Sequence, residues 1–275
     1  MPGVIARGIV FCLLSFVLLS ACGPVPTDIP QPAATPIPAT VTPAPLVDTP
    51  VPPTATPQPT ATPTPEPTAT AAVDLTLPAD WVAFSDESRG LVIHHPAEWN
   101  VTQPSVENLT ALLAEAENAV ASRSIQAILR QLTTTPGALE PFAALGFLFD
   151  DPTAANNQFV SNFTGIVVPA DGLTLDTFVK LTSAQMEAVE SIAMQSAQVE
   201  SGLRPGGLDV ASLRYALDGA ALYGLADGTQ IDGWQVALYD SDADRLLILS
   251  LTGVSGNFPN LEEMFRVLVY HIEFE

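Results

Sequence analysis

The chain has 275 residues, and its 9 Lys and Arg against 30 Asp and Glu give a formal net charge of −21 at pH 7. This length is enough for one or two domains. The negative charge repels the phosphates of nucleic acids and anionic lipid head groups, so we expect no nucleic-acid partner. The acidity itself has two interpretations, which are solubility and the attraction of cationic partners or calcium.

An apolar run at the N-terminus has the features of a secretory signal. It follows Arg7 and covers residues 8–19, which is shorter than the roughly 20 apolar residues of a membrane-spanning helix. The small residues Ser20 and Ala21 suit a cleavage point. The string at residues 19–22, LSAC, resembles the lipobox of bacterial lipoproteins, in which the cysteine becomes the new N-terminus and carries acyl chains.

This resemblance implies that residues 1–21 are a signal peptide and that Cys22 is the lipidation site, carrying palmitate or a similar acyl group. The alternatives are an ordinary signal peptide with an incidental cysteine and an uncleaved anchor. Each acyl CH₂ buried in lipid contributes about 0.8 kcal/mol, so several chains would hold the protein firmly. We therefore expect a lipid anchor on the extracytoplasmic face of the cell membrane or outer membrane. Cys12 would be lost with the signal, which leaves Cys22 no partner for a disulfide.

Residues 22–78 are rich in proline, threonine and alanine and have hardly any large apolar side chain. Proline lacks the amide donor and fixes φ, so neither a helix nor a sheet can propagate through such a segment. The composition predicts a disordered, extended linker that holds the rest of the chain away from the membrane. We expect one folded domain over residues 79–275, where aromatic residues return.

Apolar residues with a period of two predict several strands in this domain. Leu91, Ile93 and His95 share a face in the first predicted strand. The further predicted strands are 145–149, 163–168, 211–217, 234–239, 246–251 and an alternating C-terminal segment, 270–275. The polar string DSDAD at residues 240–244 joins two of them and predicts a hairpin turn.

Helical spacing appears in three places. Ser105 can cap a helix that starts at Val106, breaks near residues 122–124 and resumes through residues 128–132. Thr174 can cap a longer helix over residues 174–194, and a last helix starts near residues 257–260. Mostly antiparallel strands with one-sided helices predict an α+β fold, with an antiparallel sheet flanked by helices.

The order of these elements resembles that of PsbP-like domains. Gly90, the apolar strand 91–93, His95-Pro96 and Trp99 match the opening of that family, although His95 stands where an aromatic residue is usual. The resemblance implies an antiparallel sheet with helices on both sides, an α/β/α sandwich. Members of the family are typically non-catalytic accessory proteins, some of which bind photosystem complexes or metal ions. No functional residue of the family is carried over to this chain.

The sequence contains one weak candidate for a metal site. Asp240, Asp242 and Asp244 have the spacing that opens an EF-hand loop, but Arg245 and Leu251 stand where that loop needs glycine and glutamate. We expect an acidic turn there, with a loose calcium site as the alternative. His94 and His95 point to opposite faces of a strand and are poorly placed to bind one ion. We expect no catalytic residue and no cofactor.

These features lead to one functional hypothesis and two alternatives. The hypothesis is a membrane-anchored extracytoplasmic lipoprotein that displays a non-catalytic binding or assembly domain on a flexible stalk, with an unidentified protein partner. The alternatives are a small-solute or calcium-binding module and an enzyme whose site has no recognisable pattern.

Overall fold

The computed structural model describes residues 75–118, 137, 139–151 and 158–275. The expected signal peptide, the lipidation site Cys22, the linker up to residue 74 and the expected helical segment 128–132 lie outside the described residues.

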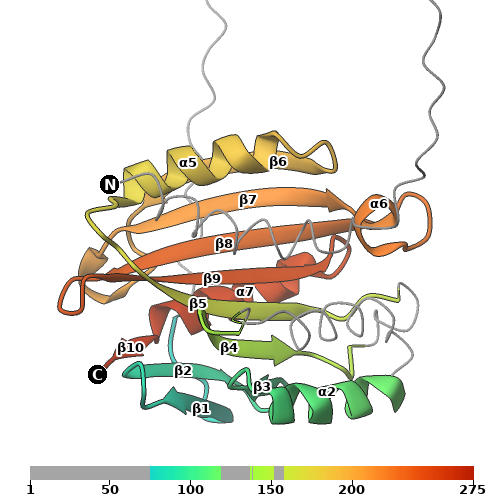
Figure 1. Ribbon diagram of the computed structural model, residues 1–275, viewed down its shortest axis with the longest axis horizontal. Coiled ribbons are helices and arrows are strands. Elements are labelled where there is room, and N and C mark those ends of the chain that lie inside the picture. The colour runs from blue at the N-terminus through green and yellow to red at the C-terminus, as the bar shows by residue number, and fades with distance from the viewer. Residues whose placement is uncertain (1–74, 119–136, 138, 152–157) are drawn as a thin grey trace, which may run out of the picture. The chain divides into compact units, whose positions relative to one another are not determined.

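The described residues form ten strands and four α-helices, which Figure 1 shows. The strands are β1 (Trp81–Asp86), β2 (Leu91–Pro96), β3 (Asn100–Thr102), β4 (Phe142–Phe147), β5 (Asn162–Pro169), β6 (Ile192–Glu200), β7 (Val210–Asp218), β8 (Gln230–Asp240), β9 (Arg245–Val254) and β10 (Glu273–Phe274). The helices are α2 (Val106–Asn118), α5 (Leu175–Glu187), α6 (Gly219–Tyr223) and α7 (Phe258–Tyr270), and the short 3₁₀ turn η1 covers Pro205–Gly207.

The strands form a large and a small sheet. The large sheet has seven strands in the order β3-β4-β5-β9-β8-β7-β6, and the small sheet has three in the order β1-β2-β10. Every pairing in both sheets is antiparallel. The predicted hairpin is confirmed, since β8 and β9 pair in register from Ile231 opposite Val254 to Asp240 opposite Arg245.

The central strands of the large sheet bury side chains on both faces. In β9, Leu246 and Ile248 belong to one apolar cluster, whereas Leu247, Leu249 and Leu251 belong to the other. All five side chains are at most 1% exposed. Because alternate residues of a strand point to opposite faces, this burial requires a covering layer on each side of the sheet.

Helices α5 and α2 cover the first face. Thr174 accepts a hydrogen bond from the amide of Thr177, and Ser105 Oγ accepts one from the amide of Asn108, so both predicted N-caps are confirmed. Phe178 of α5 and Leu109 of α2 are at most 1% exposed in the cluster on this face. Val106, the first residue of α2, is 60% exposed.

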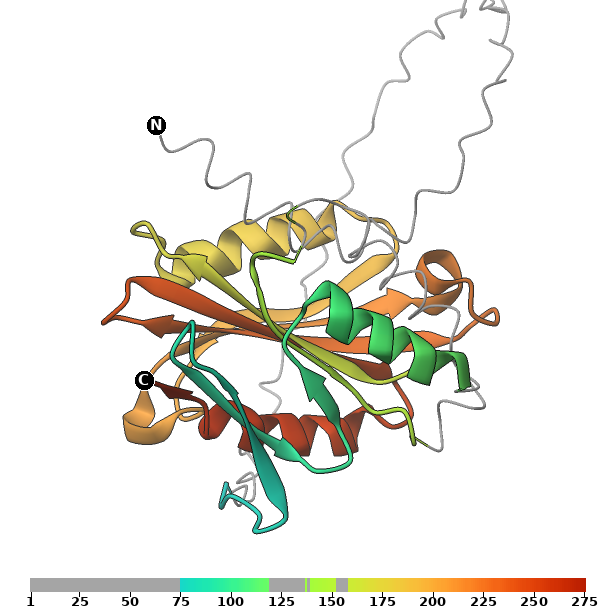
Figure 2. The ribbon, with the colours of Figure 1, turned by 60° about the horizontal axis from the view of Figure 1, so that its bottom comes forward.

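Helix α7 and the small sheet cover the second face. Leu91 and Ile93 of β2 lie in one apolar cluster with Leu261 and Phe265 of α7. Figure 2 shows α7 on one side of the large sheet and α5 on the other. The predicted α+β fold with an antiparallel sheet flanked by helices is confirmed, and its layers are those of an α/β/α sandwich.

Two predictions of secondary structure were wrong. The alternating segment 270–275 is mostly not a strand, because α7 continues to Tyr270 and β10 contains Glu273 and Phe274 alone. The helix expected over 174–194 ends at Glu187, and Ile192 begins the edge strand β6. In both segments the apolar residues fit the period of a helix as well as that of a strand. The short strand β10 forms because it pairs with β2, and β6 forms because it pairs with β7.

A close contact on the first face leaves little room for a side chain at one glycine of the large sheet. The ring of Tyr215 in β7 lies over Gly233 of β8, where a Cβ atom would come within 2.1 Å of the ring carbon Cε2. Tyr215 is 4% exposed, so its ring has little room to move away.

We predict that Gly233→Ala lowers the free energy of unfolding by about 1–3 kcal/mol, because the added methyl overpacks this contact. Gly256→Ala is the matched control, since a Cβ there meets nothing within 4 Å. Urea denaturation of the full chain measures both variants. Equal stability of the two variants would show that the Tyr215 ring is not confined.

Candidate functional site

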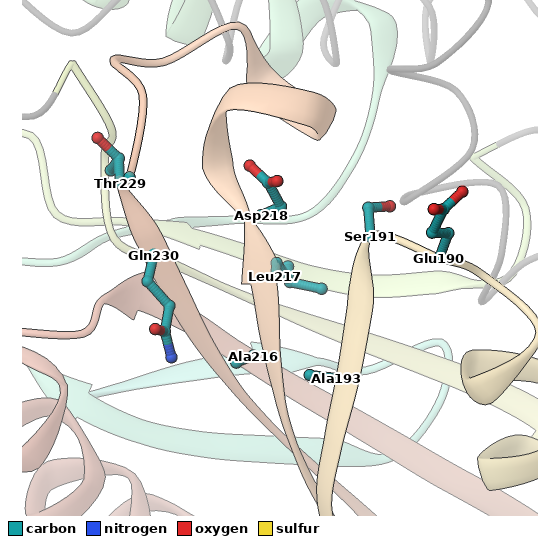
Figure 3. Close-up of a pocket in the computed structure, with 9 residues that line it drawn as sticks. Glu190, Ser191, Ala193, Ala216, Leu217, Asp218, Thr229 and Gln230 are labelled. Carbon is teal, nitrogen blue, oxygen red and sulfur yellow. The ribbon is translucent and has the colours of Figure 1, made fainter.

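An open hollow lies at one end of the large sheet, where β6, β7 and β8 begin or end. Its volume is about 370 Å³. It is lined by Glu190, Ser191, Ala193, Ala216, Leu217, Asp218, Gly228, Thr229 and Gln230. Figure 3 shows the carboxylates of Glu190 and Asp218 with the Ser191 side chain between them. The hollow offers hydrogen-bond acceptors and negative charge over an apolar floor.

Local structure fixes one of these carboxylates. Oδ1 of Asp218 accepts hydrogen bonds from the amides of Ala220 and Ala221 and thereby caps the short helix α6. The next residue, Gly219, has no room for a side chain, because a Cβ at this position would lie 2.6 Å from the carbonyl oxygen of Thr229. The tight turn therefore holds the Asp218 carboxylate at the rim of the hollow.

The carboxylates at the hollow have no ion-pair partner within the described residues. Asp232 lies on the same face of the sheet, opposite Ala216, and its Oδ1 accepts a hydrogen bond from Gln230 Nε2 at 3.2 Å. The nearby turn adds the exposed side chain of Asp227. This end of the sheet therefore presents negative charge that no described cation balances.

Two of the described arginines pack over the ring of a buried tryptophan. The guanidinium carbons of Arg214 and Arg266 lie 4.2 and 5.0 Å from the ring centre of Trp234, which is fully buried. Glu262 joins the two arginines, with a bidentate pair to Arg214 at 2.9 Å and a bond to Arg266 at 2.9 Å. Burial alone would raise the pKa of Glu262, but the hydrogen bonds from Arg214 and Arg266 outweigh it and lower that pKa.

The remaining arginines of the described residues bind backbone carbonyls and the C-terminal strand. Arg204 donates to the carbonyl oxygens of Val269 and Ile272, and Arg245 donates to that of Arg89. Arg204 and Arg245 also lie 5.9 and 5.6 Å from the ring centre of Phe274. Arg89 pairs with Asp86 and donates to the carbonyl of Glu140. These arginines therefore join segments that are distant in sequence.

The candidate calcium ligands lie in and around the β8–β9 turn, where their oxygens serve the turn itself. Oδ1 of Asp240 accepts from the amides of Asp242 and Ala243, and its Oδ2 accepts from Arg245 Nε at 2.7 Å. Oδ1 of Asp244 accepts from the hydroxyl of Tyr239, and this bond raises the pKa of Tyr239. Asp240 is 7% exposed, and both of its carboxylate oxygens are engaged by the turn amides and by Arg245.

The described residues contain neither a metal-binding cluster nor a helix suited to span a membrane. In this part of the chain, no group of three or more His, Cys, Asp or Glu side chains could hold a metal ion. None of the helices described there is long and apolar enough to cross a membrane. Cys22, the predicted lipidation site, lies outside the described residues.

Sequence reasoning did not identify the residues of the hollow. Glu190 and Asp218 are separated by β6, a loop and most of β7, and the first residues of β6 were expected to end a helix. One signal was available, because Asp218 precedes a glycine and two alanines and is followed by Gly224 and Gly228. An N-cap aspartate before a very short helix and two turn glycines predicts a compact loop at a strand end.

Comparisons with known proteins identify a structural likeness and no family. No family model matches the chain, and no curated protein matches it. Among solved structures, it is similar to the solution structure of cyanobacterial PsbP (CyanoP) from Synechocystis sp. PCC 6803, at 11% identity and a TM-score of 0.41. The likeness covers 75% of this chain and 99% of that chain. The assignment of the fold class made above rests on the strand pairings of this structure.

We predict that Glu262→Gln lowers the free energy of unfolding by about 1–3 kcal/mol at pH 7, because Arg214 and Arg266 lose their shared carboxylate. Glu263→Gln, an exposed neighbour on the same helix, should change stability by less than about 0.5 kcal/mol. Thermal or urea unfolding measures the difference.

The contribution of Glu262 to stability depends on pH, and the direction of its pKa shift gives the sign of that dependence. Because folding lowers the pKa of Glu262 below its ordinary value of 4.5, its contribution is present above that value and is lost as the pH falls through the lowered pKa. The difference in the free energy of unfolding between the wild type and Glu262→Gln should therefore decrease below about pH 4. A difference that stays constant down to pH 2 would contradict this assignment.

Proposed function

We propose that this protein is an extracytoplasmic lipoprotein, held by acyl chains on Cys22, whose folded body binds a partner and does not transform a substrate. The support for the anchor is the order of an apolar run, the string LSAC and the proline-rich segment 22–78. That segment would hold the body at a distance from the lipid surface.

The observation that carries the binding function is the unbalanced negative charge at the open end of the sheet. Glu190 and Asp218 face the hollow, while the described arginines pair with carboxylates, carbonyls and rings elsewhere. A partner with a basic surface would recover Coulomb energy here and would be drawn to this end of the body. We therefore propose a cationic protein partner.

The edge of the large sheet beside the hollow gives such a partner a second means of attachment. β6 is an edge strand whose hydrogen-bonded neighbour is β7, so its outer backbone groups can pair with an extended segment. The ladder between β6 and β7 has an irregularity between Met194 and Ser196. This bulge limits continuous pairing with other chains, so we expect side-chain charge to provide most of the selectivity.

A small cationic solute is the second candidate occupant, because a hollow of about 370 Å³ has the size of a small-molecule site. Titration calorimetry with calcium and with spermidine distinguishes the two candidates. Binding of a small cation that Glu190→Gln abolishes would favour solute capture over a protein partner.

The anchor can be tested by acyl labelling in cells. We predict that the wild-type chain incorporates labelled palmitate and that its mature N-terminus begins at residue 22, whereas Cys22→Ser incorporates none and leaves the membrane fraction. Mass spectrometry of the mature chain is the measurement. A mature chain that retains residue 12 without a lipid would exclude the anchor.

The partner can be tested by crosslinking in intact cells followed by capture of the full chain. We predict that the double variant Glu190→Gln, Asp218→Asn recovers the partner at least fivefold less well, roughly 1 kcal/mol of binding free energy. Asparagine still caps a helix, so α6 should persist. The control with the same charge change is Glu87→Gln, Glu263→Gln, at two exposed sites elsewhere.

Equal recovery of the partner by the two double variants would show that the hollow is not part of the interface. Recovery that does not fall with added salt would also contradict an electrostatic contact.

A further inference from the structure

A second hollow lies near the opposite edge of the large sheet. It is bounded by the end of β2, by β3 and by one face of α2, and its volume is about 430 Å³. The lining residues include Val82, His95, Trp99, Thr102, Asn108 and Leu112. His95 is the one ionisable side chain among them, and the others are uncharged.

His95 has one ring nitrogen engaged and one unengaged. Its Nδ1 lies 2.9 Å from the carbonyl oxygen of Pro96. Because a carbonyl oxygen can only accept, Nδ1 must carry the proton, and Nε2 of the neutral ring is then an acceptor. Within the described residues, Nε2 has no hydrogen-bond partner. The residue as a whole is 6% exposed, but Nε2 is not among the fully enclosed, unpartnered side-chain atoms of the described residues, so it can be reached from the hollow.

The neutral form of the ring is favoured by its surroundings. Burial lowers the pKa of His95, and the neighbouring His94 lowers it further, whereas the Pro96 carbonyl and Glu98 raise it to a smaller extent. At pH 7 the ring therefore holds a lone pair at Nε2 and carries no charge.

The other walls of the hollow combine apolar side chains with polar groups. Trp99 is 4% exposed and Leu112 is 6% exposed, while Val82 at the rim is 45% exposed. Asn108 and Thr102 supply polar groups, and each already donates to the carbonyl of Gln103. A charged ligand would lose its hydration here without meeting an opposite charge, which makes its binding unfavourable.

We propose that this hollow binds an uncharged small molecule with an apolar body and one hydroxyl or N–H group, which donates its proton to Nε2 of His95. An unengaged acceptor that a bound ligand would cover selects for a donor, because a ligand without one leaves Nε2 desolvated and unpaired. The proposal does not depend on the acidic hollow, which lies beside the opposite edge strand, β6.

Three probes with the same ring system test this chemistry on the full chain. 2-Naphthol has the donor, 2-methoxynaphthalene has the same body without it, and 2-naphthoate carries a charge. We expect 2-naphthol to bind about tenfold more tightly than 2-methoxynaphthalene, the ratio that one net hydrogen bond of about 1.4 kcal/mol produces. We expect 2-naphthoate to bind most weakly. Imidazole nitrogen NMR should show the Nε2 resonance of His95 shifting with 2-naphthol alone.

Two substitutions at the same position form a matched pair. The amide nitrogen in His95→Asn can replace Nδ1 and bond the Pro96 carbonyl, but nothing replaces Nε2. The amide oxygen in His95→Gln can reach the position of Nε2. We expect His95→Asn to lose about tenfold in 2-naphthol affinity with 2-methoxynaphthalene unchanged, and His95→Gln to stay within about threefold of the wild type.

The proposal fails if 2-naphthol and 2-methoxynaphthalene bind equally, if 2-naphthoate binds most tightly, or if 2-naphthol does not bind at millimolar concentration. Circular dichroism checks that both variants fold. If either does not, the comparison of the three probes on the wild type decides the question alone, because it needs no substitution.

Discussion

The burial of strand β9 on both faces is the constraint on which the rest of this structure depends. Its five central leucine and isoleucine residues, Leu246 to Leu249 and Leu251, are almost completely enclosed, so a single covering layer would leave half of them in water. At about 25 cal/mol per Å² of apolar surface, each such side chain contributes on the order of 1.5–3 kcal/mol when buried. Helices α2 and α5 on one face, and α7 with the small sheet on the other, meet this requirement.

The placement of the few cations follows from the same requirement. The loops and helices that cover the sheet come from distant parts of the chain, and the described arginines join them: Arg204 to the end of α7, Arg245 to the loop before β2, and Arg214 to α7. A guanidinium can serve a carboxylate, a carbonyl and an aromatic ring together, which lysine cannot do as well. Because the described arginines are used in these internal contacts, few cations are left to balance the carboxylates on the described part of the surface.

The sequence was most informative where an apolar pattern fitted only one kind of secondary structure. The runs in β5, β7, β8 and β9 are largely apolar, and all were predicted as strands. The edge strand β6 was missed because one of its faces is exposed, as at Ala193, and its bulge shifts the alternation after Met194. The two hollows could not be predicted, because each combines residues from separate elements whose proximity depends on strand order, as with Glu190 and Asp218.

Both hollows lie near edges of the large sheet, and this position has a physical reason. α7 packs against β9 and β2. On the same face of the sheet, β6 and the ends of β7 and β8 are therefore left uncovered near Ala193 and Asp218. At the other edge β3 has three residues, and the gap between it, the end of β2 and α2 is lined by Trp99 and His95. The strand order that encloses β9 thus leaves incomplete coverage at both edges, one acidic and one uncharged. Because the two linings differ in charge, the hollows favour ligands of different chemistry, and one can be altered without affecting the other.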